Sequence, residues 1–338
     1  NWYIDDFGIG VHLMNDYTKV QSGLQLSDEL TEYYTVIKNE FEDHIKREIA
    51  KEPPEIAPLI EKGLNGGKKL RPVLCRLVSD ALGGDTHLAF ECGMALELIH
   101  SGALIHDDWI DGDKFRRAAP SLWNELGPRT AVLAADLMVA TGSLHGAISV
   151  EIGKSLASCV RDLSEGAIAD FTDKENYSES VYLHRIKRKT AALYSTAAEL
   201  GALVSPRTEL APKMYKYGEC VGIIYQITDD YLDVVNSLVT RTPVGDLALK
   251  IPTLPLTKLS KYSQYKEVVN DFMLNGNTKK LLKTVQVEHA QKVFEKLIKP
   301  WQDMALNFID DVPDNREKRL LQQVPVAFAN ELISADKN

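Results

Sequence analysis

The sequence predicts an all-α protein built as one domain, and three observations support this prediction. Apolar residues recur every three or four positions along most of the chain, as they do on one face of a helix. No alternation of polar and apolar residues extends beyond four positions, so no half-buried strand is expected. No repeat of solenoid length is present, and 338 residues suffice for one large helical core. We assign residues 1–25 to an N-terminal extension and 26–338 to the domain.

The first half of the domain is predicted to contain helices separated by proline and glycine. An amphipathic helix begins at Ser27, which fits an N-cap, and ends before Pro53. Glycine pairs bound a later helix, at Gly66-Gly67 and Gly83-Gly84. The helices expected after the first one cover about 55–64, 68–82, 86–111, 129–150 and 151–172.

The second half is expected to begin with two long helices, at about 178–203 and 209–236. From Ile251 onward the pattern changes to shorter amphipathic pieces. Breaks between these pieces are expected at Asn275-Gly276, Pro300 and Pro313.

Composition argues against several classes of protein. The net charge of −9 is unfavourable for a nucleic-acid surface. No run of 18 uncharged apolar residues is present, so no transmembrane helix is expected. The first residues lack the basic and apolar pattern of a secretion signal, and we expect a cytoplasmic protein. The four cysteines fit no zinc spacing and are expected to be buried, reduced thiols.

Two aspartate-rich segments, each near the end of an apolar helix, are candidate metal sites. Asp107 and Asp111 lie four residues apart and therefore share one helix face. The same spacing recurs 122 residues later, at Asp229 and Asp233. Like charges so close repel each other, and divalent cations that carry a polyphosphate would offset this repulsion. The third carboxylates of the two segments are Asp108 and Asp230.

Further motifs accompany the aspartates in a definite order. They are Gly66-Gly67-Lys68-Lys69-Leu70-Arg71-Pro72, His106-Asp107-Asp108 through Arg116-Arg117, Lys189-Thr190, Gln226-Ile227-Thr228-Asp229-Asp230, and Lys250 before Thr253-Leu254-Pro255. From about Gly63 to its end, the chain therefore resembles the all-trans polyprenyl diphosphate synthases of the geranylgeranyl type or longer. The resemblance implies an isoprenoid-synthase helical bundle with a central cavity, as a polyprenyl synthase domain. It also implies head-to-tail condensation of isopentenyl diphosphate with an allylic diphosphate.

The resemblance implies binding roles for individual residues. Mg²⁺ is the expected cofactor, with up to three ions bound together with the substrate diphosphate. The expected direct ligands are Asp107, Asp111 and Asp229. Residues expected to act through water or to orient the ligands are Asp108, Asp230 and Asp233. Residues that match contacts to isopentenyl diphosphate are Lys68, Arg71, His100 and Arg117, and the residue that matches a contact to the allylic diphosphate is Arg116.

Other matched residues surround the reacting carbon atoms in this family. Lys189, Gln226 and Lys250 match residues that reach the departing pyrophosphate or the developing allylic cation. Thr190 would place its hydroxyl and backbone carbonyl near that cation. The protein need not supply a base, because the released pyrophosphate can take the proton. The resemblance also implies a homodimer.

Small residues before the first aspartates predict a long product. Gly102 and Ala103 occupy positions where short-chain farnesyl synthases of this family usually carry an aromatic ring. Each open helical turn of about 5.4 Å admits about one more isoprene unit, and burying that unit is favourable. We therefore expect a product of twenty carbons or more. Phenylalanine at either position is expected to shift the product toward fifteen carbons.

One loop departs from the family's pattern. Thr242 replaces the first lysine, one residue is missing before Asp246, and Leu249 replaces the glycine before Lys250. Turnover is therefore expected to be slower, unless Arg241 takes the place of the missing lysine.

Three alternatives compete with the synthase. A terpene cyclase shares the fold, but its second metal motif is usually a mixture of Asn, Ser and Glu, unlike Asp229-Asp230-Tyr231-Leu232-Asp233. A metal phosphohydrolase could use His106 and Asp107, but it would require further histidine ligands. A weakly active partner subunit of a heteromeric synthase is favoured only by the altered loop.

Overall fold

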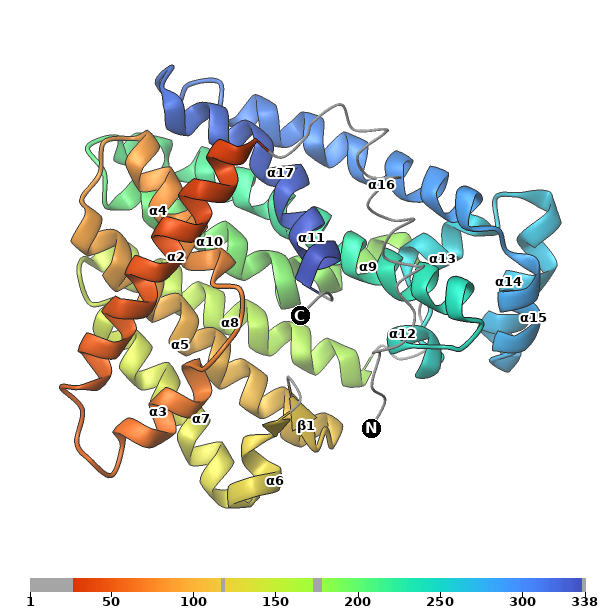
Figure 1. The fold of residues 1–338 in the computed structure, drawn as a ribbon, viewed down its shortest axis with the longest axis horizontal. Helices are drawn as coiled ribbons and strands as arrows, with labels where there is room; N and C mark the ends of the chain where they lie inside the picture. Colours follow the sequence, from red (N-terminus) through yellow and green to blue (C-terminus); the bar gives the residue numbers. More distant parts are fainter. Residues whose placement is uncertain (1–26, 117–118, 173–177, 336–338) are drawn as a thin grey trace.

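The computed structural model describes residues 27–116, 119–172 and 178–335, which are almost entirely helical (Figure 1). The predicted extension at residues 1–25 lies outside this part of the chain. The elements up to residue 172 are α2 (Asp28–Ile49), α3 (Ala57–Leu64), α4 (Leu70–Ala81), α5 (Thr86–Asp111), β1 (Phe115–Arg116), β2 (Ala119–Pro120), α6 (Leu122–Leu126), α7 (Pro128–His145) and α8 (Val150–Thr172). Those that follow are α9 (Glu179–Ile186), the π-helical segment η1 (Lys187–Ala191), α10 (Ala192–Leu203), the 3₁₀ turn η2 (Thr208–Leu210), α11 (Ala211–Thr240), α12 (Gly245–Ala248), α13 (Leu254–Leu259), α14 (Ser263–Asn275), α15 (Thr278–Thr284), α16 (Val287–Phe308) and α17 (Arg316–Ala335). The all-α prediction is confirmed.

Local capping chemistry explains where the important helices begin and end. Ser27 is the N-cap of α2, and its Oγ accepts a hydrogen bond from the N–H of Leu30 at 3.2 Å. Asp85 caps α5 in the same way, accepting from the N–H of Leu88 at 2.8 Å. Helix α5 ends at Gly112, whose φ of 75° is left-handed and favours glycine. These caps define both ends of the helix that carries the first aspartates.

Two apolar cores share one helix, α11. Its first half contributes residues such as Met214 and Tyr217 to the larger core, together with α2, α4, α5, α7, α8 and α10. Its second half contributes Ile227 and Val234 to a smaller core with α13, α14, α15 and α16. Figure 1 shows the same division, with α2, α3 and α7 on the left and α14 and α15 on the right. Because α11 packs in both cores, the aspartates on it are held on a rigid element.

Two glycines bring the backbone of α11 into contact with those of α10 and η1. A Cβ atom on Gly218 would lie 2.2 Å from the carbonyl oxygen of Tyr194. A Cβ atom on Gly222 would lie 2.5 Å from the Cα atom of Ala191. Both distances are shorter than real Cβ contacts. Since Ala191 directly follows Thr190, this contact sets how far Thr190 stands from α11.

Helix α5 is a core helix of the bundle. In the described part of the chain it alone is long and apolar enough to span a membrane, but 72% of its most apolar stretch is buried inside the protein. The helix has apolar residues on all sides, which is typical of a helix surrounded by others. The four cysteines are also buried and unpaired, which confirms that part of the prediction.

Two helices extend further than the sequence predicts. Pro300 does not break the chain, because α16 continues through it. Burial of Phe294 and Ala305 on either side offsets the hydrogen bond that proline removes. Helix α11 continues to Thr240, about two turns beyond Asp233. The second aspartate cluster therefore lies inside its helix, where the negative end of the helix dipole has little influence.

We expect Gly218→Ala to lower the free energy of unfolding by about 1–3 kcal/mol, the usual cost of an extra methyl group in a packed core. Gly153→Ala in α8 is the matched control, because nothing lies within 4 Å of a Cβ atom there. Alanine is the better helix former by about 1 kcal/mol, so this variant should gain stability. Urea unfolding measures both changes, and equal changes would contradict the proposed backbone contact.

Candidate active site

The first aspartate cluster lies at the end of α5, and its three carboxylates differ in exposure. Asp107 is half-buried, Asp111 is exposed and Asp108 is only 3% exposed. Asp108 is bound by Arg116 of β1, whose Nε lies 2.7 and 2.8 Å from the two carboxylate oxygens. Asp107 and Asp111 therefore remain accessible to a ligand, whereas Asp108 holds Arg116 in place.

The second cluster, on α11, divides in the same way. Asp229 is exposed, whereas Asp230 is 3% exposed and accepts two hydrogen bonds. Tyr182 donates to its Oδ2 at 2.6 Å, and Gln226 donates to its Oδ1 at 2.8 Å. The side-chain carbonyl of Gln226 accepts a hydrogen bond from the Thr190 hydroxyl at 2.6 Å. One network thus joins two expected catalytic residues, Thr190 and Gln226, to the buried aspartate.

Lys189 lies among carboxylates from α5 and α8. Its Nζ is 2.6 Å from Oδ2 of Asp170, whose other oxygen lies 2.9 Å from Nε of Arg185. Burial opposes the ammonium charge, but the hydrogen bond to Asp170 and the charges of Asp107 and Asp111 raise the pKa of Lys189. The lysine belongs to η1, and π-helical segments are frequent at functional sites.

Asp170 and Asp246 are site residues that the sequence analysis did not single out. Asp170 is a lone aspartate on the amphipathic helix α8, and no sequence signal distinguishes it. Asp246 belongs to the Asp-Leu pair of the altered loop, and this pair was a signal that could have identified it. The N–H of Asp246 donates to Oδ2 of Asp233 at 2.9 Å. Glycine is needed before it, because a Cβ atom on Gly245 would lie 1.8 Å from the same oxygen. The altered loop is therefore attached to the second cluster.

Burial and repulsion by neighbouring carboxylates raise the pKa values of three carboxyl groups in this region. Burial raises the pKa of Asp230 to about 7. Burial, together with the charge of Asp233, raises the pKa of Asp246 to about 6, while Lys189 partly offsets this effect. Burial also raises the pKa of Asp107, again against the charge of Lys189. Lys189 thus acts on carboxylates beside both clusters, and negative charge remains in excess.

The donor set fits Mg²⁺, a hard cation that prefers carboxylate oxygens. The accessible carboxylates of Asp107, Asp111 and Asp229 come from two helices. Burial and the charge of Asp111 disfavour the ionised form of Asp107, which a bound cation would stabilise. Among the described residues, none of the six aspartates belongs to a group of three whose ligand atoms lie within 4.8 Å of one another. Such separation is favourable for carboxylates that repel each other without a cation.

The basic segment before α4 divides its side chains between the core and the site. Lys69 turns inward, and its Nζ lies 3.2 Å from Oε2 of Glu97. Lys68 and Arg71 are half-buried. The Arg71 guanidinium lies 5.0 Å from the centroid of the Tyr194 ring, and its buried Nε has no hydrogen-bond partner in the described part of the chain. An unpaired guanidinium N–H is suited to bind an anion such as a diphosphate.

Three other site residues are expected from the sequence. His100 is half-buried on α5, about two turns before Asp107. Arg117 lies outside the described residues. Lys250 is exposed and its side chain lies against Gly276, where a Cβ atom would be 2.6 Å from the lysine Cδ. No contact described for Lys250 joins it to the aspartates.

Arg241, the possible substitute for the missing lysine, is engaged with α15. It ends α11 in a left-handed conformation with a φ of 58°. Its Nη1 donates a hydrogen bond to the carbonyl oxygen of Leu282 in α15. The guanidinium is therefore used to join α11 to α15, and Thr242 beside it is exposed.

The two small residues expected to control product length have different surroundings. A Cβ atom on Gly102 would lie 2.9 Å from the carbonyl oxygen of Ala135 and 3.0 Å from Cγ2 of Val139, both on α7. Gly102 therefore allows α5 and α7 to pack closely, and phenylalanine there would displace α7. Ala103 is half-buried. The close packing at Gly102 therefore leaves Ala103 as the candidate for limiting product length.

Comparison with known proteins identifies the family. Residues 53–297 match the family model of polyprenyl synthetases. The chain belongs to the polyprenyl synthetase family. The short chain isoprenyl diphosphate synthase of Methanothermobacter thermautotrophicus is 36% identical over 245 residues, which cover 68% of this chain and 73% of that protein. The geranylgeranyl diphosphate synthase of Saccharolobus solfataricus is 27% identical over 85% of this chain and 93% of its own. A crystal structure of a geranylgeranyl pyrophosphate synthase matches with a TM-score of 0.77 and 22% identity, covering 88% of this chain and 98% of that one.

A polyprenyl synthetase is a prenyltransferase, and this chain is therefore an enzyme of that class. The matched segment includes both aspartate clusters and all the other site residues expected from the sequence. The structural match confirms the isoprenoid-synthase fold. The terpene cyclase and phosphohydrolase alternatives are not favoured.

Asp230 makes the stability of the metal-free polyprenyl synthetase depend on pH. Its pKa of about 7 in the folded state exceeds the usual aspartate value of 3.8. Between these values the folded state keeps a proton that the unfolded state has lost, so stability falls as pH rises. Protonated Asp230 contributes as much as about 4 kcal/mol to the free energy of unfolding. This contribution is fully present below about pH 4 and is lost as pH rises through about 7.

Asp230→Asn keeps the shape of the side chain but cannot ionise, so this variant should lose less stability than the wild type across this pH range. Thermal unfolding of both proteins with a chelator, at about pH 5 and about pH 8, measures the difference. Parallel losses in the two proteins would show that Asp230 is not the cause.

Proposed function

We propose that this polyprenyl synthetase condenses isopentenyl diphosphate head-to-tail with an allylic diphosphate, giving an all-trans polyprenyl diphosphate of twenty carbons or more. The observation that carries the proposal is the gathering of carboxylates from α5, α8 and α12 around Lys189. The relatives support the substrate class, since they are named as short chain isoprenyl and geranylgeranyl diphosphate synthases.

Asp107, Asp111 and Asp229 hold Mg²⁺ in this proposal, with up to three ions bound together with the substrate diphosphate. Their accessible oxygens on two helices support this role. Bound Mg²⁺ supplies a Lewis acid that neutralises the charge of the departing diphosphate.

The buried carboxylates orient other groups. Asp108 fixes Arg116 through its two-oxygen contact, and Asp230 fixes the Gln226 amide. Asp233 accepts the N–H of the loop that follows α11. Side chains that hold neighbours in place in this way reduce the reorganisation needed when substrate binds.

Cationic side chains bind the two diphosphates. We assign Arg71 and Lys68 to isopentenyl diphosphate, supported by the unpaired guanidinium N–H of Arg71. Arg116 is assigned to the allylic diphosphate, because Asp108 already presents it beside the first cluster. The resemblance to the family adds His100 and Arg117 to the first of these sites.

The carbon chemistry takes place beside η1. The C–O bond of the allylic diphosphate breaks, and its electron pair leaves with the pyrophosphate, near the charge of Lys189. The double bond of isopentenyl diphosphate then attacks the allylic carbon, and the proton that is lost passes to the pyrophosphate. Thr190 and Gln226, joined by their 2.6 Å hydrogen bond, present oxygen dipoles to the developing cation. The resemblance to the family adds Lys250, whose side chain lies against Gly276, to the groups that reach the leaving pyrophosphate.

The proposal includes a homodimer in the cytoplasm. Leu133 and Leu144 on α7 are 69% and 76% exposed and lie about three helical turns apart on the same face, which a second copy of the chain would cover. The four unpaired cysteines fit a reducing compartment.

Incubation of the purified protein with isopentenyl diphosphate, an allylic primer and Mg²⁺ tests the function, with the products analysed by chromatography. Linear prenyl diphosphates of twenty carbons or more are expected. A cyclic hydrocarbon made without consumption of isopentenyl diphosphate would indicate a cyclase. No product at all would indicate a partner subunit.

In the same assay, Asp107→Asn should reduce turnover by about a hundredfold or more, because a group that stabilises charge in the transition state is lost. Asp113→Asn is the matched control, since Asp113 is exposed just after α5 and is assigned no role. Turnover of the Asp107 variant within about tenfold of the control, a barrier difference below about 1.4 kcal/mol, would remove Asp107 from the metal site.

Ala103→Phe should shift the products toward fifteen carbons. One helical turn is about as long as one isoprene unit, so the ring would fill the space that the next unit needs. Gly102→Phe should instead lower the melting temperature, because α7 stands against that position. Product chromatography and thermal unfolding of both variants measure the two effects. Unchanged products from a folded Ala103→Phe enzyme would place the end of the product elsewhere.

A further inference from the structure

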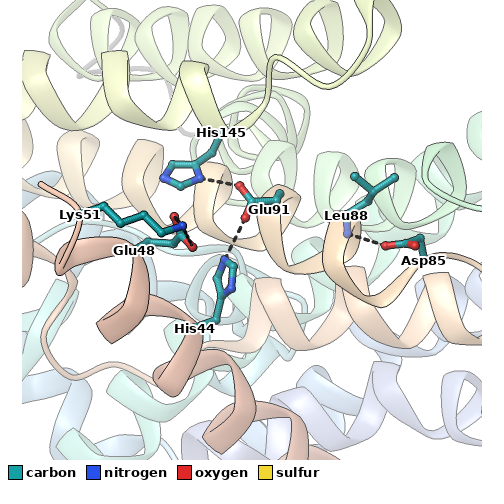
Figure 2. A network of polar contacts seen from close by, with 7 residues as sticks. All are labelled: His44, Glu48, Lys51, Asp85, Leu88, Glu91 and His145. Atoms are coloured by element: carbon teal, nitrogen blue, oxygen red, sulfur yellow. Dashed lines mark hydrogen bonds and ion pairs between the residues drawn. The ribbon is translucent and has the colours of Figure 1, made fainter.

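A second cluster of potential metal ligands lies near the opposite end of α5. Figure 2 shows Glu91 of α5 between His44 and Glu48 of α2 on one side and His145, the last residue of α7, on the other. Glu91 precedes Asp107 by 16 residues of one continuous helix, or about 24 Å at 1.5 Å per residue. This histidine–glutamate cluster is therefore separate from the aspartates.

Both oxygens of Glu91 face an imidazole ring. Nδ1 of His145 lies 2.7 Å from Oε2, and Nε2 of His44 lies 3.3 Å from Oε1. The ligand atoms of His44, Glu48 and Glu91 all lie within 4.8 Å of one another. In a tetrahedral zinc site, nitrogen and oxygen ligands lie about 2.0–2.2 Å from the ion and therefore about 3.5 Å from one another. The three ligand atoms would have to move only slightly closer together to reach this arrangement.

The His44 ring nitrogen is left unsatisfied in this cluster. His44 is 3% exposed, and its buried Nε2 makes no hydrogen bond within the described ranges of the chain. The contact with Glu91 is close but lacks hydrogen-bond geometry. Burial lowers the pKa of His44, against the charge of Glu91, which favours the neutral ring. A buried ring nitrogen without a hydrogen bond is unfavourable, and a cation between this nitrogen and the Glu91 carboxylate would satisfy both groups.

We propose that His44, Glu48 and Glu91 bind a divalent transition-metal ion of the zinc type. Imidazole nitrogen combined with carboxylate oxygen favours such an ion over Mg²⁺, which prefers oxygen ligands alone. His145 holds the second oxygen of Glu91 and so orients this ligand, as histidine–carboxylate pairs commonly do around metals. The two carboxylates balance the charge of the ion.

Lys51 is the group that must move when the ion binds. Its Nζ lies 2.7 Å from each oxygen of Glu48, and its side chain is 68% exposed. Exposed ion pairs of this kind contribute little to stability, so Glu48 can be released at small cost. The bound ion would then join α2 to α5, and because only the folded chain assembles the cluster, it would raise the melting temperature.

The test is a Zn²⁺ titration of the full chain after treatment with a chelator. No substrate is added, and the buffer contains excess Mg²⁺ to occupy the aspartates. Binding is measured by competition with a zinc-sensitive dye, and stability by thermal unfolding. One equivalent of Zn²⁺ should bind and raise the melting temperature. Glu91→Gln should abolish this binding, and Glu48→Gln should weaken it by at least about tenfold, as loss of a ligand does.

Glu42→Gln is the matched control on α2, because Glu42 pairs with Lys38 outside the cluster, and it should bind Zn²⁺ like the wild type. Asp107→Asn should also bind normally, which separates this site from the aspartates. If Glu91→Gln does not fold, the comparison of Glu48→Gln with Glu42→Gln decides. Equal binding by these two variants, loss of binding in Asp107→Asn, or no binding by the wild type would overturn the proposal.

Discussion

The concentration of carboxylates between α5, α8 and α11 is the constraint on which the arrangement of the site depends. Each carboxylate loses hydration when it is buried and repels its neighbours, which is why the pKa values of Asp230 and Asp246 are raised. Lys189 offsets part of this charge. Such a region is destabilising by itself and forms only on a scaffold that is stable without it. The two apolar cores joined by α11 provide that scaffold.

Backbone packing, more than side-chain length, sets the positions of the reactive groups. Gly218 and Gly222 bring α11 against α10, directly after the π-helical segment that carries Lys189 and Thr190. This close approach allows Thr190 to reach Gln226, which in turn binds the buried Asp230. Helices α5 and α7 pack in the same way, because Gly102 of α5 allows the two backbones to approach closely. Rigid elements in contact place catalytic groups more reproducibly than loops do.

Helix α5 joins two regions of different ligand chemistry. At its C-terminal end the carboxylates offer oxygen ligands alone, which suit Mg²⁺ and a diphosphate. Near its N-terminal end Glu91 meets two histidines, a combination that suits a softer ion. Most of the residues between the two regions are apolar and buried, and about 24 Å of helix separates Glu91 from Asp107, so each ion would have a site of its own. Selectivity between the ions then follows from ligand type.

The sequence by itself determined the fold class and the positions of most helices, and it identified the six aspartates as candidate metal ligands. Both helical periodicity and the spacing of four residues between aspartates are local properties. Only the tertiary structure decided which carboxylates are accessible, that Asp170 and Asp246 join the site, and that Gly102 faces α7. It also decided that Lys250 lies against Gly276 and that His44 meets Glu91. These contacts join residues far apart in the chain, and their distances depend on how closely helices pack, which no local pattern encodes.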